Sequence, residues 1–106
     1  MTYPLCDRIV TLYRKNGDQV ERYVLENCYY RFTDVLEEGR FLRKFLLVRP
    51  GSFPIRPGDR VLEGVGPEEV DWDTFLPVNV PGLSQAEYAI PNYWLGQLIH
   101  WEAGRK

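Results

Sequence analysis

The stretch FLLVRPGSFPIRPGDRVLEG, at residues 45–64, decides the fold. It contains two short apolar runs, FLLV at 45–48 and RVLE at 60–63, joined by a connection rich in proline and glycine. Each run is long enough for a β-strand and too short for a helix. Pro54 and Pro57 fix φ and donate no ladder hydrogen bond, so the connection must be a defined loop. The stretch therefore predicts a small β domain.

The composition limits the classes of protein to which this chain can belong. A chain of 106 residues is one domain, which we expect to span residues 1–106. Hydrophobic residues at 44% and charged residues at 26% are ordinary values for a globular protein. The net charge of −2 and the scattered basic residues argue against sequence-specific nucleic-acid binding, because phosphate contacts depend on clustered Lys and Arg.

Neither a membrane span nor an export signal is expected. No apolar run approaches the ~20 residues that a membrane helix needs. The opening residues, MTYPLCDR, lack the basic start and the long apolar centre of a signal peptide. We therefore expect the chain to be made and to stay in a cytosol.

The first third of the chain predicts a β-hairpin. Residues 7–15 alternate in side-chain character, as a strand does, and a return strand is expected at about 19–29. Asn16-Gly17 lies between them, and this pair is a strong signal for a type I′ turn, which needs positive φ at both central positions.

The expected turn fixes a register. It places Tyr13 opposite Val20, a favourable cross-strand pair. It also places Cys6 opposite Asn27, one position away from Cys28. Two cysteines are too few for a disulfide framework, and this pair is out of register, so we predict two free thiols.

The rest of the chain predicts further strands. A polar break is expected at residues 33–39, and the Pro-rich residues 76–85 should be irregular and the most mobile part of the chain. The expected strands beyond the first hairpin are 40–49, 59–65, 86–90 and 95–103. The predicted fold class is mainly β: a small antiparallel β-barrel or sandwich of about 5–6 strands with one short helix.

That short helix is expected at residues 67–75. Proline suits the first helical position, and the carboxylates of Glu68 and Glu69 suit the positive end of the helix dipole. With Asp71 and Asp73 they form an acidic cluster whose spacing does not match a calcium loop. We interpret the cluster as a solvated helix face; a site for a cation or a basic partner is the alternative.

No sequence pattern indicates catalysis. His100 is the sole histidine, and no Ser/His/Asp or Cys/His arrangement has catalytic spacing. The Gly64-Val65-Gly66 triplet lacks the spacing of a dinucleotide-binding loop and the lysine of a P-loop. We therefore expect no enzyme activity, no catalytic residue, no metal and no cofactor.

Aromatic residues are abundant near the end of the chain. Most of them are expected in the core of a small β domain. Tyr93 and Trp94, between Pro91 and Gly96, form the pair that we expect to be exposed and to contact a partner.

Three segments together resemble a known family. They are DRIVTLYRK at residues 7–15, the stretch at 45–64, and HWEAG at 100–104. The chain resembles small proteins from siphophages and prophages of Gram-positive bacteria that serve as minor capsid, head-completion or head–tail connector proteins. The segments cover under half of the chain, and the Pro-rich residues 76–92 do not match the threonine-rich strand usual in that family.

The resemblance implies a structural role in the virion through protein–protein assembly, in the virion and the host bacterial cytoplasm. The expected partners are portal, adaptor or tail components, and the subunit would close into a homo-oligomeric ring. Contacts would use β-edge addition and loop insertion by residues 39–43, 51–56 and 76–85. The candidate interaction residues are Arg43, Phe53, Arg56, Glu68, Glu69, Asp71, Tyr93 and Trp94.

A second function stays open at this point. The chain could be a small cytosolic β-barrel binding module that holds a peptide or small ligand on an aromatic face of Tyr93, Trp94 and Trp101. Such a module should have a concave aromatic cluster in the free protein. A connector subunit should instead have a closed core with long loops that become ordered on assembly.

Overall fold

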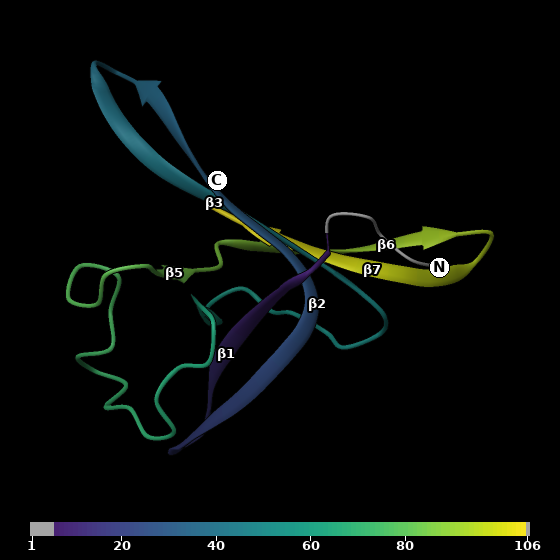
Figure 1. Ribbon diagram of the computed structural model, residues 1–106, viewed down its shortest axis with the longest axis horizontal. Helices are drawn as coiled ribbons and strands as arrows, with labels where there is room; N and C mark the ends of the chain where they lie inside the picture. The colour runs from purple at the N-terminus through teal and green to yellow at the C-terminus, as the bar shows by residue number, and fades with distance from the viewer. Residues whose placement is uncertain (1–5, 106) are drawn as a thin grey trace.

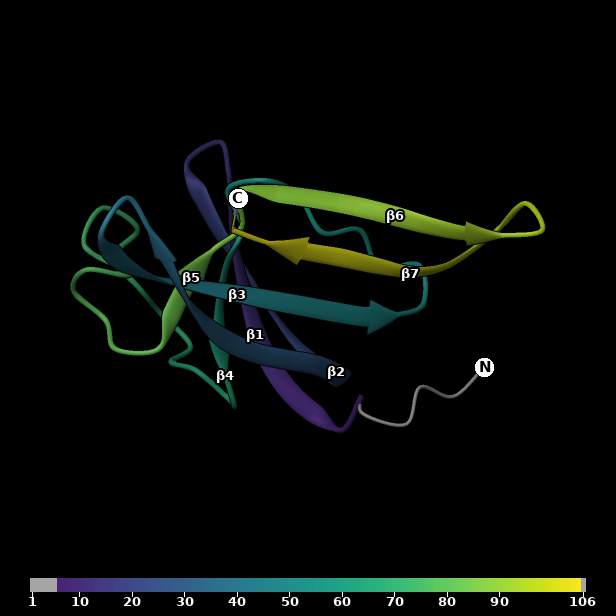
Figure 2. The ribbon, with the colours of Figure 1, turned by 90° about the horizontal axis from the view of Figure 1, so that it is seen from above.

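The protein is an antiparallel β-sheet curled into a half-barrel, and no helix occurs within residues 6–105, which the computed structural model describes. Those residues form seven strands in the sheet order β5-β4-β1-β2-β3-β7-β6, against the five or six expected. The strands are β1 (Arg8–Asn16), β2 (Gln19–Glu37), β3 (Arg40–Pro50), β4 (Arg60–Glu63), β5 (Leu83–Gln85), β6 (Tyr88–Trp94) and β7 (Gln97–Gly104). Figures 1 and 2 show the sheet from two directions.

The first hairpin forms, but its register differs from the predicted one. Asn16 pairs with Gln19, so the two-residue turn is Gly17-Asp18 and lies one residue later than expected. Of the two turn residues only Gly17 has positive φ, 63°, as a type II′ turn requires. From Val10 to Asn16 every partner therefore moves by two residues, and Tyr13 lies opposite Arg22. An even shift leaves each side chain on its predicted face, because the side-chain period of a strand is two.

Strand β2 is much longer than predicted and serves both halves of the sheet. A β-bulge interrupts its pairing with β1, where Asn27 takes a positive φ of 59°. Bulges bend the strand that carries the extra residue. Beyond the bulge β2 pairs with β3 up to Glu37, and the expected polar break at residues 33–39 is wrong. The chain turns instead at Glu38-Gly39.

Two hairpins project from the body of the sheet (Figure 1). The first, here called the ribbon, consists of residues 31–45 of β2 and β3, which pair only with each other because β3 meets β7 from Leu46 onward. The second, here called the hairpin tip, consists of residues 90–99 around the Leu95-Gly96 turn of β6 and β7. The strand expected at residues 86–90 ended before Pro91, yet β6 runs through this proline, because β6 is an edge strand where a missing donor is tolerated.

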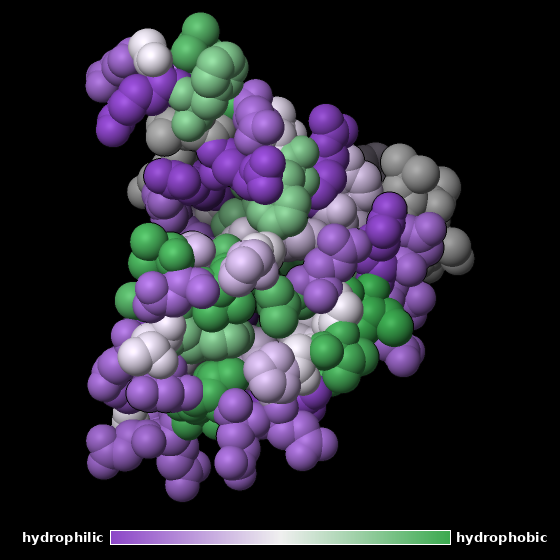
Figure 3. Space-filling model, turned by 60° about the vertical axis from the view of Figure 1, so that its left-hand side comes forward, coloured by the Kyte–Doolittle hydropathy of each residue, from purple (hydrophilic) through white to green (hydrophobic). Residues whose placement is uncertain are grey.

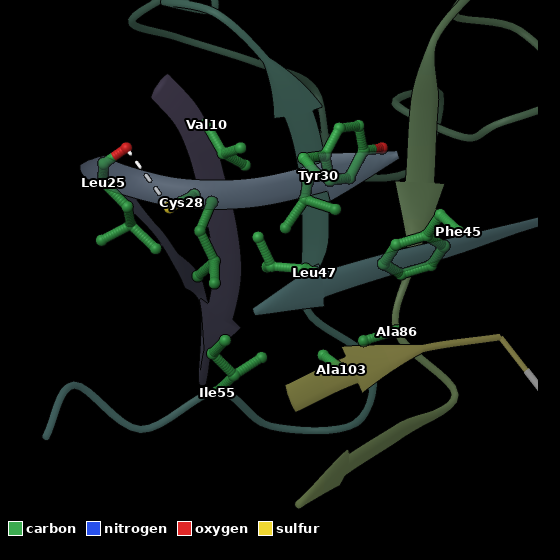
Figure 4. Close-up of a cluster of buried hydrophobic side chains, with 11 residues drawn as sticks. Val10, Leu25, Cys28, Tyr30, Phe45, Leu47, Ile55, Ala86 and Ala103 are labelled. Atoms are coloured by element: carbon green, nitrogen blue, oxygen red, sulfur yellow. Dashed lines mark hydrogen bonds between the residues drawn. The ribbon is translucent and has the colours of Figure 1, made fainter. Parts of the chain in front are cut away.

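The core lies on the concave face of the half-barrel. Strands β1, β2, β3, β4 and β7 all contribute to it, and Ile55 enters from the loop between β3 and β4 (Figure 4). That loop is the stiff connection predicted from Pro54 and Pro57. Cys28 is fully buried in this core, where its thiol donates to the Leu25 carbonyl at 3.6 Å. Cys6 and Cys28 are both free thiols, as predicted.

The predicted helix at residues 67–75 is not present. The segment contains one helical hydrogen bond, from the Phe75 amide to the Asp71 carbonyl at 2.9 Å. The guanidinium of Arg60 in β4 donates to the carbonyls of Trp72 and Phe75 and lies 3.7 Å from the centre of the Trp72 ring, which ties the segment to the sheet. A nine-residue helix is marginal by itself, and the segment instead packs Val70, Trp72 and Phe75 against Tyr13 and Leu83 as an irregular loop.

Candidate assembly surfaces

A groove of about 590 Å³ lies between the base of the ribbon and the loop that leads into β5. Phe45 and Leu83 are buried beneath it, whereas Val78, 87% exposed, stands at its side. Figure 3 views the molecule from this side and shows apolar side chains gathered below the charged ribbon. The full lining is Phe32, Arg43, Phe45, Leu76, Pro77, Val78, Gly82, Leu83, Ser84, Gln85, Glu87 and Arg105.

Two arginines border the groove. Arg105 is ion-paired with Glu87 at 3.2 Å and also donates to the Arg43 carbonyl at 3.3 Å. Arg43 is ion-paired with Asp34 at 3.2 Å and lies 5.4 Å from the centre of the Phe32 ring. All of these ion pairs are exposed, and such pairs contribute little to stability. Both guanidiniums are therefore held above an apolar surface by contacts that a binding partner could replace.

The hairpin tip exposes large apolar side chains. Tyr93 is 62% exposed, Trp94 63% and Leu95 88%. Leu95 also has a φ of 50°, a left-handed conformation that is unfavourable for a branched apolar residue. The exposure predicted for Tyr93 and Trp94 agrees with this placement.

The end of the ribbon carries a second exposed apolar pair. Leu36 and Phe41 lie opposite each other on β2 and β3, at 61% and 78% exposure. Beside them, Lys44 donates to Glu37 at 2.8 Å, and this hydrogen bond lowers the pKa of the Glu37 carboxyl.

Two predicted contact residues lie in the loop between β3 and β4. Phe53 is half-buried: its ring packs edge-on against Tyr23 with centroids 5.0 Å apart, and the Arg14 guanidinium is 5.7 Å from it. Phe53 therefore belongs to the packing of the loop. Arg56 has an exposed side chain, and its backbone amide donates to the Asp59 carboxylate at 2.9 Å.

The acidic residues lie on a different surface. Glu68, Glu69 and Asp71 are all exposed in the loop between β4 and β5, and none of them lines the groove. Asp71 accepts a hydrogen bond from the Asp73 amide at 3.2 Å, which organises the local turn. No group of His, Cys, Asp and Glu side chains suited to a metal ion occurs among the described residues.

The aromatic face proposed for the alternative function is divided. Trp101 is half-buried and packs against the core, opposite Pro91, whereas Tyr93 and Trp94 lie further out on the hairpin tip. None of the three lines the groove.

The sequence-based prediction placed Arg43, Tyr93 and Trp94 on accessible surfaces but missed most of the groove. Its lining comes from β2, β3, β5 and the segments around residues 76–82 and 105, so no local pattern could reveal it. Leu95 was missed although a signal was present: residues 90–99, IPNYWLGQLI, contain no charged residue.

The chain was compared with protein-family models, with curated proteins and with solved structures, and none of the three comparisons found a match. Within the described residues, no helix of a length and apolar character that could cross a membrane occurs.

Proposed function

We propose that this protein is a structural component of a phage or prophage virion, a minor capsid or head-completion protein that acts at the head–tail interface by protein–protein assembly. The observation that carries the proposal is the pair of projecting hairpins, each with large exposed apolar side chains at its end.

The ribbon supports an assembly role through its energetics. A two-stranded hairpin without a third strand is only marginally stable in water. The ribbon also leaves both outer edges unpaired over most of its length. Unpaired edges and an exposed Leu36–Phe41 pair are costly unless a partner covers them. The charged side chains of the ribbon surround that apolar pair, as the polar rim of an interface surrounds its apolar centre.

The kind of partner follows from the shape of these surfaces. Both projecting hairpins present unpaired strand edges and exposed apolar side chains, which suit packing against other protein subunits in a fixed assembly. Portal, adaptor or tail components are the neighbours that the family resemblance implies. Homo-oligomeric ring closure would supply the remaining contacts.

The experiment is a deletion of the gene from the source prophage, followed by induction and electron microscopy of the particles. We expect DNA-filled heads without tails, together with free tails, and we expect the wild-type gene to restore tailed particles. A gene carrying Leu36→Ser and Phe41→Ser should fail to restore them. Val24→Ser with Ile9→Ser, which changes two exposed apolar residues on the body of the sheet, is the matched control and should restore them. Tailed, infectious particles from the deletion strain would refute the proposal.

A further inference from the structure

We propose that this protein assembles head to tail, with the hairpin tip of one copy inserted into the groove of the next copy. The occupant of the groove is thus a second copy of this chain. The inference deepens the proposed function, on which its setting in a particle rests, but its test uses the purified protein alone.

The composition of the hairpin tip fits burial in an interface. Residues 90–99 contain no charged side chain, in a chain of which 26% is charged. The ribbon, by contrast, carries seven charged residues between positions 31 and 45. The buried centre of an interface is depleted of charge and enriched in aromatic residues. Of the two projections, the hairpin tip is therefore the one suited to enter a groove.

Leu95 gives an independent argument. At a φ of 50° an asparagine or glycine would be easier to accommodate than leucine. The Leu95 side chain is 88% exposed, so packing within the chain does not account for this choice. Strained residues persist where function requires their side chains, and here the requirement would be contact with another molecule.

The groove fits the tip in size and chemistry. Its volume of about 590 Å³ is in the range of sites that enclose large apolar groups. Phe32, Phe45 and Leu76 offer apolar surface to Trp94 and Leu95. At the border, the guanidiniums of Arg43 and Arg105 can stack on the exposed aromatic rings of an incoming tip.

The hairpin tip and the groove lie far apart on the molecule, so a contact between them can be repeated from copy to copy. In Figure 1 the hairpin tip is at the right and the segment leading into β5 is at the left, at opposite ends of a molecule 41 Å long. A copy cannot fill its own groove with its own tip. Because the two surfaces differ, the contact is heterologous, and repeated use builds a ring or a filament.

The test is sedimentation velocity on the purified full-length protein and on single variants over a range of concentrations. The average mass of the wild type in solution should rise, as its concentration increases, to at least twice the monomer mass of 12.5 kDa. Trp94→Glu on the tip and Val78→Arg on the groove should each stay monomeric. An equimolar mixture of the two should form a complex of twice the monomer mass. The intact tip of the Val78→Arg copy can enter the intact groove of the Trp94→Glu copy, and the two surfaces left over are both mutated, so no further copy can add. Val24→Glu, at an exposed position on the body of the sheet, is the control and should assemble as the wild type does.

Leu95→Asn separates association from folding. It should keep or raise the midpoint of thermal unfolding and weaken self-association roughly tenfold or more, as loss of an interface anchor does. A monomeric wild type at every concentration would overturn the inference, and so would a mixture of Trp94→Glu and Val78→Arg that stays monomeric. Either result would leave the virion role to be decided by the deletion experiment.

Discussion

Arg14 and Asp59 form a buried ion pair with two parallel hydrogen bonds, Nε to Oδ1 at 2.9 Å and Nη2 to Oδ2 at 2.7 Å. Arg14 also donates to the Pro54 carbonyl at 2.8 Å, and Asp59 accepts from the Arg56 amide. The hydrogen bond that Arg14 donates to Asp59 raises the pKa of the Arg14 guanidinium above its usual value. The pair therefore fastens the loop between β3 and β4 onto β1, and that loop carries Ile55 into the core.

Removal of the Asp59 carboxylate should be strongly destabilising. Asp59→Ala leaves the Arg14 charge buried without its partner, and breaking a buried pair in this way costs about 3–5 kcal/mol of unfolding free energy. Urea unfolding followed by tryptophan fluorescence measures the loss. The control is Asp34→Ala, which removes the exposed partner of Arg43 and should cost no more than about 1 kcal/mol. Equal losses for the two variants would contradict the role assigned to the buried pair.

Thr11 joins β1 to the segment that follows β4. Its hydroxyl donates to the Gly64 carbonyl at 2.6 Å and accepts from the Gly66 amide at 2.9 Å, and the side chain is fully buried. Thr11→Val keeps the shape and removes both hydrogen bonds, so we expect a loss of about 1–3 kcal/mol. Thr33→Val, at an exposed position of the ribbon, should change the unfolding free energy by less than about 0.5 kcal/mol. A neutral Thr11→Val variant would show that the hydroxyl is dispensable.

The turn of the hairpin tip should tolerate a better turn former. Leu95→Asn relieves the left-handed strain and should raise the unfolding free energy by about 0.5–1 kcal/mol, or leave it unchanged if the tip frays before the core unfolds. Gly96→Ala, at a φ of 80°, should destabilise the same turn. Differential scanning calorimetry at equal protein concentration gives both changes. A destabilised Leu95→Asn variant would mean that Leu95 serves folding.

Burial should make stability fall at alkaline pH. It raises the pKa of the Cys28 thiol from 9.0 to about 11 and that of the Tyr30 phenol from 10.0 to about 12. Both groups are neutral when protonated, so the unfolded chain loses these protons first as the pH rises. The stability that they contribute is complete below about pH 9 and declines toward pH 11 and above. Cys28→Ala should flatten the first part of that decline in urea titrations from pH 8 to pH 11.

The same shift predicts unequal thiol reactivity. At pH 8 native Cys28 has roughly 100-fold less thiolate than a thiol of pKa 9.0, and it is also inaccessible. Cys6 is partly exposed and should react first with a disulfide reagent. Cys6→Ser should remove the fast phase, and denaturant should make both thiols react. Equal rates in the native protein would contradict the burial of Cys28.

The mainly β class, the first hairpin and the stiff loop could be predicted because each depends on local sequence. Asn16-Gly17 predicted a turn, but Asn-Gly and Gly-Asp are both common two-residue turns, so the local sequence did not decide between Asn16-Gly17 and Gly17-Asp18. The helix at residues 67–75 was wrong because so short a helix depends on tertiary packing, and here Val70, Trp72 and Phe75 pack against Tyr13 and Leu83 without one.

The ribbon was misjudged for a related reason. Thr33-Asp34 and Glu37-Glu38 are polar because the ribbon is exposed on both faces, and polarity was interpreted as a loop. Cross-strand ion pairs such as Asp34–Arg43 accompany a regular ladder there. Segments 39–43 and 76–85, which supply part of the groove, were named as contact segments, but the groove itself could not be predicted, because the curl of the sheet brings Phe32, Leu83 and Arg105 together.

The most direct test of the proposed function is quantitative peptide mass spectrometry on purified phage particles from an induced culture of the source strain. We predict that this protein is present in the particles, at low copy number relative to the major capsid protein. Particles that form and contain none of it would contradict the virion assignment.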